Sequence, residues 1–253
     1  MISFSEAQIT AWLSPLLWPF FRVLALFMTA PVLSSRAVPM RLKIALAFLV
    51  TLAAQAALAP GAAITLDAPE APGVLLQQLV VGAAIGLAAR IVVAAVEYAG
   101  ELVGLQMGLG FAAFFEPSAG GQANAVSRYL GTLAALLFIV LNGHLLLVAA
   151  VVQSFQAFPV APSPMAFLQA VSVQRWGAEL FRLGLWLALP VLAMLLFTNL
   201  VMGVISRVAQ QLNIFAIGFP VTLGVGLLGL LLTLPLLEQP FTQALEQMLG
   251  QLR

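Results

Sequence analysis

Long stretches of this 253-residue chain carry no charged side chain, and this limits what the chain can fold into. The stretch 44–66 is uncharged throughout, and no Asp, Glu, Lys or Arg occurs between Tyr129 and Gln174. Charged residues make up 8% of the sequence, against about 25% in ordinary soluble domains. Because a membrane helix needs about 20 consecutive apolar residues, these runs predict several membrane helices and exclude a soluble globular fold.

Prolines, glycines and the few charges divide the sequence into about six long apolar helices, some of them broken. We therefore predict an all-α membrane protein with a single membrane domain over residues 1–253. An amphipathic tail is expected after Pro240, and the fourth helix contains Asn142-Gly143-His144. The expected helices cover about 7–33, 44–66, 74 to the stretch that begins at 106, 129–158, 176–206 and 217–237.

The basic residues predict the orientation of these helices. Arg36, Arg41 and Lys43 form the densest basic cluster, and basic loops of membrane proteins stay in the cytoplasm. The acidic turn with Asp67 and Glu70 then lies outside. Six crossings would place both termini outside and the turns 34–43, 106–128 and 207–216 inside.

The stretch from Gln106 to Arg128, QMGLGFAAFFEPSAGGQANAVSR, is the least ordinary part of the chain. Its density of glycine and proline ends a helix, because Gly costs about 1 kcal/mol and interior Pro about 3 kcal/mol per helical position. Irregular backbone at membrane depth has to be buried in protein or line a cavity. An apolar, glycine-hinged loop with Phe111, Phe114 and Phe115 is suited to closing a path. A surface loop whose phenylalanines enter the membrane interface explains the same residues, and the composition leaves both interpretations open.

Four charged residues lie well inside predicted helices, namely Arg22, Arg90, Glu97 and Glu101, and Glu179 and Arg182 lie near the start of the helix 176–206. Arg90, Glu97 and Glu101 lie seven and four residues apart, so they share one helix face. They can form a proton relay, ion pairs to neighbouring helices, or a helix end near water. A charge at a helix centre is costly in lipid. We therefore expect Arg22, Arg90 and Arg182 to contact other subunits or water within a complex.

The sequence lacks the motifs of common enzymes. It contains no Walker loop, no HExxH, no G-x-S-x-G and no zinc-ligand spacing. There is no cysteine and one histidine, His144, for which a packing role is expected. The net charge of +1 gives no reason to expect nucleic acid. We expect no cofactor, no metal and no enzymatic activity, although the residues alone leave three classes open: a pore or gate subunit, a secondary transporter, and a membrane enzyme of lipid metabolism.

Four segments of the chain, in this order and spacing, resemble the FliR family of flagellar type III export-gate proteins, which is related to the injectisome proteins SpaR and SctT. The resemblance covers essentially the whole chain, and its most specific part is NIFAIGFP. The segments are AWLSPLLWPFFRVLALFMTAPVLSSRAVPMRLKIALAF, QMGLGFAAFFEP, LFIVLNGHLLLV and ISRVAQQLNIFAIGFPVTLGVGLL.

The resemblance implies a FliP-like first part, about 1–175, joined to a FliQ-like C-terminal helical hairpin, about 176–253. It implies a subunit of the export gate in the basal body of the bacterial flagellum, in the inner membrane. The subunit would join FliP and FliQ in a helical hetero-oligomer, and unfolded flagellar proteins would cross the membrane through its pore. The alternative is a multi-pass secondary transporter of a small solute.

The resemblance also assigns roles to individual residues. The loop 106–122 would be the pore plug, and the hairpin tip would lie at the cytoplasmic entrance, where FlhB is expected. The plug residues are Met107, Gly108, Gly110, Phe111, Phe114, Phe115 and Pro117. The hairpin-tip residues are Arg207, Gln211, Asn213, Phe215, Gly218 and Pro220.

Overall fold

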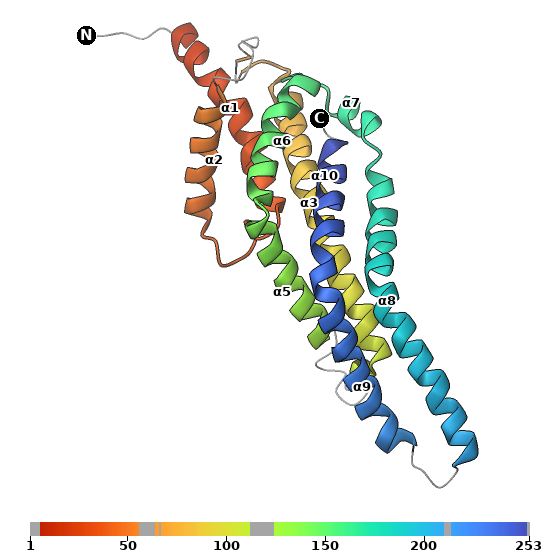
Figure 1. The fold of residues 1–253 in the computed structure, drawn as a ribbon. Coiled ribbons are helices and arrows are strands. Elements are labelled where there is room, and N and C mark those ends of the chain that lie inside the picture. Colours follow the sequence, from red (N-terminus) through yellow and green to blue (C-terminus); the bar gives the residue numbers. More distant parts are fainter. Residues whose placement is uncertain (1–5, 56–63, 66, 112–123, 210–213, 252–253) are drawn as a thin grey trace. The chain divides into compact units, whose positions relative to one another are not determined.

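The computed structural model of the chain describes residues 6–55, 64–65, 67–111, 124–209 and 214–251. Within these ranges the side chains of residues 6–13, 111, 164–165 and 214–216 are not described. All regular structure in the described ranges is helical, and no strand occurs in them (Figure 1). This confirms the predicted all-α membrane fold.

Most helix ends fall within a few residues of the predicted ones, because glycine, proline and the charges mark them. The predicted helix 176–206, for example, is α8, Val173–Val208. The other elements are α1 Glu6–Thr29, α2 Met40–Gln55, α3 Ala71–Gln106, η1 Leu109–Phe111, α5 Ala125–Val140, α6 Gly143–Ala157, α7 Pro164–Ala170, α9 Ile214–Thr233, η3 Leu234–Leu237 and α10 Glu238–Gly250.

The prediction of one continuous helix over 129–158 is wrong. The helix breaks between α5 and α6, where Asn142 adopts a left-handed φ of 57°. Asn tolerates this conformation better than other non-glycine residues. The next residue has to be small, since a Cβ on Gly143 would lie 2.5 Å from Cδ2 of Phe138. Asn142-Gly143 was therefore the sequence signal for the break.

Three helical segments of the described chain are long and apolar enough to cross a membrane: α3, α8 and the segment Ile217–Gly250. A fourth span is possible if α5 and α6 together form one broken span. Residues Ser14–Thr29 of α1 form a shorter apolar helix, and α2 has 16 residues. Within the described ranges, length and composition thus support three or four crossings, whereas the sequence predicts six.

The chain divides into two compact units, and each consists of segments from distant parts of the sequence. The first unit comprises residues 1–91, 138–176 and 245–253, and the second comprises 92–137 and 177–244. The predicted division near residue 175 separates a FliP-like part from a FliQ-like part. This likeness stays a prediction.

In the first unit, α1 packs against α2 and α6 (Figure 1). Trp18 of α1 packs with Ala71 and Val74 at the start of α3, and its indole N–H donates to the Ile64 carbonyl at 3.3 Å. The hydroxyl of Ser14 donates to the same carbonyl at 3.0 Å. These contacts hold α1 against the beginning of α3.

In the second unit, glycines allow close helix packing. A Cβ on Gly184 of α8 would lie 2.7 Å from the Ala95 carbonyl oxygen of α3. One turn further along α3, the ring of Tyr98 meets the ring of Phe181 edge to face, with 5.2 Å between the centroids. Small residues at such contacts are typical of helix packing in membranes.

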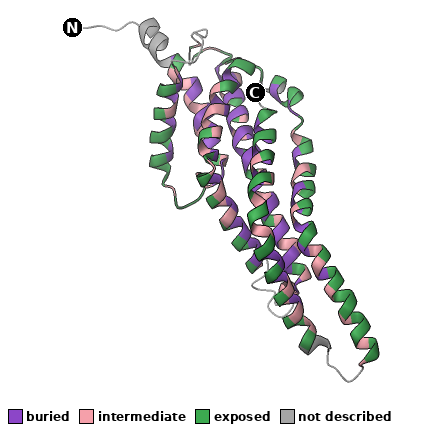
Figure 2. Ribbon diagram, in the orientation of Figure 1, coloured by how far each residue is buried: buried purple, intermediate pink, exposed green. Residues whose placement is uncertain are grey.

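Burial differs between the long helices (Figure 2). The most apolar part of α3 is 61% buried inside the chain, whereas the most apolar part of α8 is only 17% buried. The exposed side chains of α8 include Phe181, Trp186, Leu189, Phe197 and Leu200. Helix α8 therefore presents a large apolar face that the described part of the chain does not cover.

Candidate functional site

The glycine- and phenylalanine-rich stretch starts where α3 ends, and the chain is described again from Asn124, just before α5. Met107, Gly108 and Gly110 lie in the described part, as does the backbone of Phe111. The predicted plug residues Phe114, Phe115 and Pro117 lie outside the described residues. Convergence of the phenylalanines on a pore axis therefore stays a prediction, and the site can be built from the two ends of the stretch.

The first end is held by one face of α9, through contacts that we call the Met107 anchor. The Met107 side chain is fully buried, and its sulfur fills the space beside Gly226, where a Cβ would lie 2.6 Å from Sδ. The hydroxyl of Thr222 donates to the Met107 carbonyl at 3.4 Å. Gly108 adopts φ +85°, and a Cβ there would lie 3.3 Å from the ring of Phe219.

The α9 residues of the Met107 anchor follow helical spacing. Phe219, Thr222 and Gly226 lie three and four residues apart, so they form one stripe on the helix. Gly108 ends α3 in the left-handed conformation that glycine adopts without steric cost. The chain therefore leaves α3 at a fixed point on α9.

The second end is held by α3, through contacts that we call the Asn124 clasp. The side-chain oxygen of Asn124 accepts from the Ser127 amide at 2.9 Å, so Asn124 caps the N-terminus of α5. Its side-chain amide donates to the Glu101 carbonyl at 3.2 Å, and its backbone N–H donates to the Glu101 carboxylate at 3.4 Å. The Ser127 hydroxyl donates to the Glu97 carbonyl at 2.8 Å.

Glycines make the clasp possible. A Cβ on Gly100 of α3 would lie 2.6 Å from Cα of Ser127, so only glycine allows α5 to approach this closely. On the opposite helix, a Cβ on Gly131 would lie 2.7 Å from Cγ of Glu97. Glycine at these two positions therefore lets α3 and α5 approach closely, as small residues do in membrane helix packing.

Both carboxylates of the predicted acidic stripe lie at the clasp. Glu101 accepts a hydrogen bond from Asn124, and the side chain of Glu97 packs over Gly131. Among the described residues, the one ion pair joins Glu179 and Arg182 within α8. Of the alternatives that the sequence left open, the geometry favours a structural role for Glu97 and Glu101 in joining α3 to α5.

For Arg22, the expected contact with water or other subunits is wrong. Arg22 is fully buried and donates to Gln78 Oε1 at 2.8 Å, to Ser154 Oγ at 3.0 Å and to the Phe158 carbonyl at 2.7 Å. Its guanidinium carbon also lies 3.9 Å from the centroid of the Phe155 ring. The partners come from α3, α6 and the residue after α6, which is why sequence spacing gave no sign of them.

Arg90 and Arg182 are exposed on the surface of the chain, so their predicted contact with water or other subunits stays a prediction. Each also has a partner inside the chain. Arg90 donates to the Ser34 hydroxyl at 3.0 Å, and Arg182 pairs with Glu179 three residues earlier. Such exposed pairs contribute little to stability, about 0–1 kcal/mol.

The predicted hairpin tip is described only in part. Helix α8 ends at Val208 after Arg207, and α9 begins at Ile214 with Gly218 and Pro220 inside it. Gln211 and Asn213 lie outside the described residues, and the side chain of Phe215 is not described. In the described ranges there is no group of three or more His, Cys, Asp or Glu side chains that could hold a metal ion.

Sequence reasoning missed the partners of the stretch on α9 and α5. Thr222 and Gly226 lie more than a hundred residues from Met107, and a hydrophobic pattern does not show which helices meet. Gly224, Gly226 and Gly229 in an otherwise apolar helix were a signal that another element approaches it closely. Asn124, directly before Ala125, was a signal for a helix start, because Asn is a favoured N-cap residue.

Comparison with known proteins covers nearly the whole chain. The family described as "Bacterial export proteins, family 1" matches residues 13–248. The flagellar biosynthetic protein FliR of Pectobacterium carotovorum is 41% identical over 97% of this chain and 93% of its own length. FliR of Escherichia coli is 39% identical over the same shares of the two chains. FliR of Bacillus subtilis is 28% identical over 84% of this chain and 83% of its own length. The chain therefore belongs to the FliR family of bacterial export proteins.

Proposed function

We propose that this chain is the FliR subunit of a flagellar type III export gate, which forms and closes the pore through which unfolded flagellar proteins cross the bacterial inner membrane. The observation that carries this proposal is the 41% identity to a flagellar biosynthetic protein FliR over 97% of the chain. The apolar helices α3, α8 and Ile217–Gly250 support a place in a membrane.

The pore-closing role is assigned to the stretch 106–122. The described residues support this role, because both ends of the stretch are held in place by contacts with neighbouring helices. The Met107 anchor holds the first end on α9, and the Asn124 clasp holds the second end on α3. Both lie in the second unit, so one compact body holds both ends of the stretch. A closing element needs such a support, because an apolar constriction excludes water and ions only while it stays narrow.

The partners in this proposal are FliP and FliQ in a common helical assembly, with FlhB at the hairpin tip. The exposed apolar face of α8 supports a place among other membrane subunits, because apolar patches this large mark surfaces for proteins or lipid. The gate performs no chemical reaction in this proposal.

The test of the export role is complementation. An Escherichia coli strain that lacks its own FliR is supplied with this chain, and swimming and the amount of secreted flagellar hook protein are measured. We expect both to be restored at least in part, since the Escherichia coli protein is 39% identical. Normal assembly of this chain with the host's FliP and FliQ but no secreted hook protein would contradict the export role.

The pore-closing role has a separate test, the ion conductance of cells that express the assembled complex. Changing both Phe111 and Phe114 to Ala should make closed complexes leak ions, because the apolar volume of the constriction falls. Leu at both positions should leak less than Ala, and Glu116→Gln should leak least, since it keeps the apolar residues. An assembled double Ala variant as tight as the parent would show that this stretch does not close the pore.

A further inference from the structure

Four basic residues gather at the turn between α1 and α2. Arg36 and Arg41 are exposed on the turn and at the start of α2. Arg90 reaches the same turn from α3, donating to the Ser34 hydroxyl at 3.0 Å. Lys43 is buried and donates to the Ser35 carbonyl at 3.3 Å. We call Arg36, Arg41, Lys43 and Arg90 the basic corner, and all four belong to the first unit.

The basic corner has no counter-charge in the described part of the chain, where the one ion pair lies on α8. The acids of the first unit whose side chains are described are Asp67 and Glu70, just before α3, and Glu246, an exposed residue of α10. Arg90 lies 19 positions after Ala71, where α3 begins. At about 1.5 Å per residue, the acidic and basic ends of this part of α3 are roughly 28 Å apart.

This separation is close to the thickness of the hydrocarbon core of a bilayer, about 30 Å. Between the two ends, the exposed positions of α3 are apolar. Leu76, Leu79 and Leu87 are exposed and lie on one face at helical spacing, and Arg90 continues the same face. The polar residues of this part of α3, Gln77 and Gln78, are buried.

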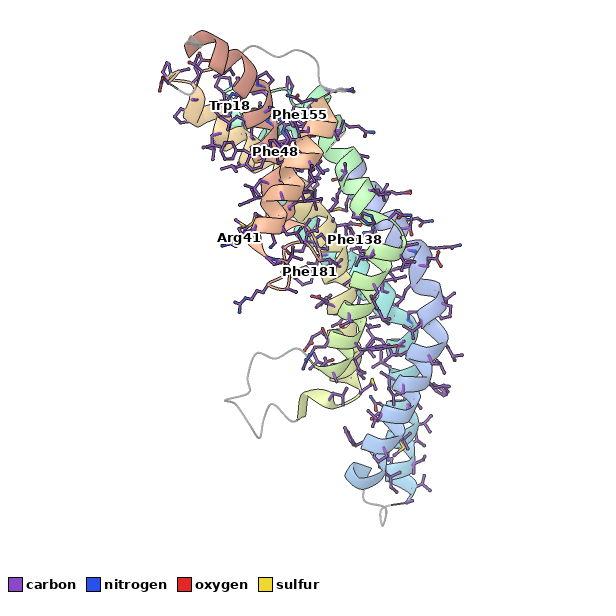
Figure 3. The ribbon with its side chains drawn as sticks, turned by 90° about the vertical axis from the view of Figure 1, so that its left-hand side faces the viewer. Trp18, Arg41, Phe48, Phe138, Phe155 and Phe181 are labelled. Atoms are coloured by element: carbon purple, nitrogen blue, oxygen red, sulfur yellow. The ribbon has the colours of Figure 1, made fainter. Side chains whose placement is uncertain are left out.

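Helix α2 repeats the arrangement independently. Its second residue is Arg41 at the basic corner, and its exposed side chains further along include Phe48, Leu49 and Leu52. Figure 3 shows Arg41 near one end of α2 and Phe48 further along it. Two helices thus present apolar faces that each end in an arginine at the same corner.

The backbone of the turn is also unusual. Val32 adopts φ 62°, and for a β-branched residue a positive φ is a true outlier. Hydrogen bonds fix the turn in this conformation, from the Ser34 amide to the Ala30 carbonyl at 3.0 Å and from the Ser35 amide to the Val32 carbonyl at 3.1 Å. Such strained residues concentrate at places where the chain holds a ligand or another body.

We propose that the basic corner binds the phosphate of an anionic phospholipid, with the exposed apolar faces of α2 and α3 against its acyl chains. Guanidinium groups bind phosphate with two parallel hydrogen bonds. Basic side chains at the boundary between an apolar helix face and water are positioned for a headgroup. The lipid fits better than an acidic protein segment, because a lipid satisfies the charged corner and the apolar faces together. This inference does not depend on the export role.

The test is native mass spectrometry of the full-length chain in detergent, titrated with phosphatidylglycerol or with phosphatidylcholine of the same acyl chains. Each basic residue near an anionic surface contributes a factor of about five to binding. We therefore expect Arg41→Gln to weaken phosphatidylglycerol binding about fivefold. The triple change of Arg36, Arg41 and Arg90 to Gln should weaken it roughly 100-fold. Phosphatidylcholine should bind weakly to all forms.

The matched control changes Arg128, Arg175 and Arg207 to Gln, which removes the same charge from exposed positions elsewhere. It should bind phosphatidylglycerol within about twofold of the parent. A triple change of Arg36, Arg41 and Arg90 to Lys keeps the charge but loses the two-pronged bonds, so its affinity should lie between those of the parent and the Gln variant. Arg41 makes no described hydrogen bond through its side chain, so its single variant tests the proposal even if the triple variant misfolds.

Three results would overturn the proposal. The first is that the parent binds the two lipids equally well, or that the control variant loses as much phosphatidylglycerol binding as the triple Gln variant of the basic corner. The second is displacement of the lipid by inorganic phosphate at the same concentration, which would indicate a site for the free anion. The third is unchanged lipid binding in the triple Gln variant together with lost association with other export subunits, which would make the corner a protein interface.

Discussion

A missing side chain at Gly226 decides where α3 ends against α9. The space that a Cβ would occupy holds Sδ of the buried Met107, and Thr222, one turn earlier on α9, donates to the Met107 carbonyl. Gly224, two positions away, has nothing within 4 Å of its Cβ position. The two glycines therefore differ in function although they look alike in the sequence.

We predict that Gly226→Val destabilises the protein by about 1–3 kcal/mol, because the added isopropyl group overfills the space that the Met107 side chain occupies. Gly224→Val is the matched control and should change stability by less than about 1 kcal/mol, since its Cβ meets open space and Val is at least as favourable as Gly in a helix. Thermal unfolding of the purified protein in detergent measures the difference. Equal losses from the two changes would show that the Met107 anchor does not carry this stability.

In the first unit, Arg22 is a buried cation that donates hydrogen bonds to neutral acceptors. We predict that Arg22→Gln lowers the free energy of unfolding by about 2–3 kcal/mol, because the change leaves Ser154 and the Phe158 carbonyl without their charged donor. Arg22→Lys should be nearly as harmful, since one ammonium does not reproduce the planar fork. Arg182→Gln, at an exposed pair, should change stability by less than about 1 kcal/mol.

At the scale of helices, α3 and α5 illustrate what the sequence could and could not predict. The predicted ends of most helices were nearly correct, and glycines four residues apart in α3 are a pattern typical of a close helix neighbour. The identity of the neighbour was not predictable, because Asn124 and Ser127 meet α3 through backbone carbonyls, which every residue type provides. The break at Asn142 was missed because the apolar run continues on both sides of it.

The pairing of α3 with α5 leads to a prediction for the glycine row. Gly100→Ala should destabilise the protein by about 1–3 kcal/mol, because the new Cβ collides with the backbone of Ser127, which cannot rotate away. The control is Gly203→Ala on α8, whose Cβ position is open. It should stabilise its helix by up to about 1 kcal/mol through propensity alone. Urea unfolding in detergent separates the two, and a stabilised Gly100→Ala variant would contradict the close approach.

For the whole molecule, the open question is which parts of the chain face each side of the membrane. The chain contains no cysteine, so single cysteines can be introduced and labelled without background. We predict that Ser35→Cys and Arg207→Cys react only with reagents that enter the cytoplasm. Asp67→Cys and Arg175→Cys should react with reagents that cannot cross the membrane. Labelling of Ser35→Cys and Asp67→Cys from the same side would contradict the predicted orientation of the basic and acidic turns.

The Met107 anchor and the Asn124 clasp together have a practical consequence for protein engineering. All contacts described for them use residues up to Gly108 or from Asn124 onwards. A cassette exchange of residues 109–123 would therefore leave every residue named in the Met107 anchor and the Asn124 clasp unchanged. Replacements of different length and chemistry would turn this chain into a scaffold on which membrane barriers with chosen leak rates can be compared.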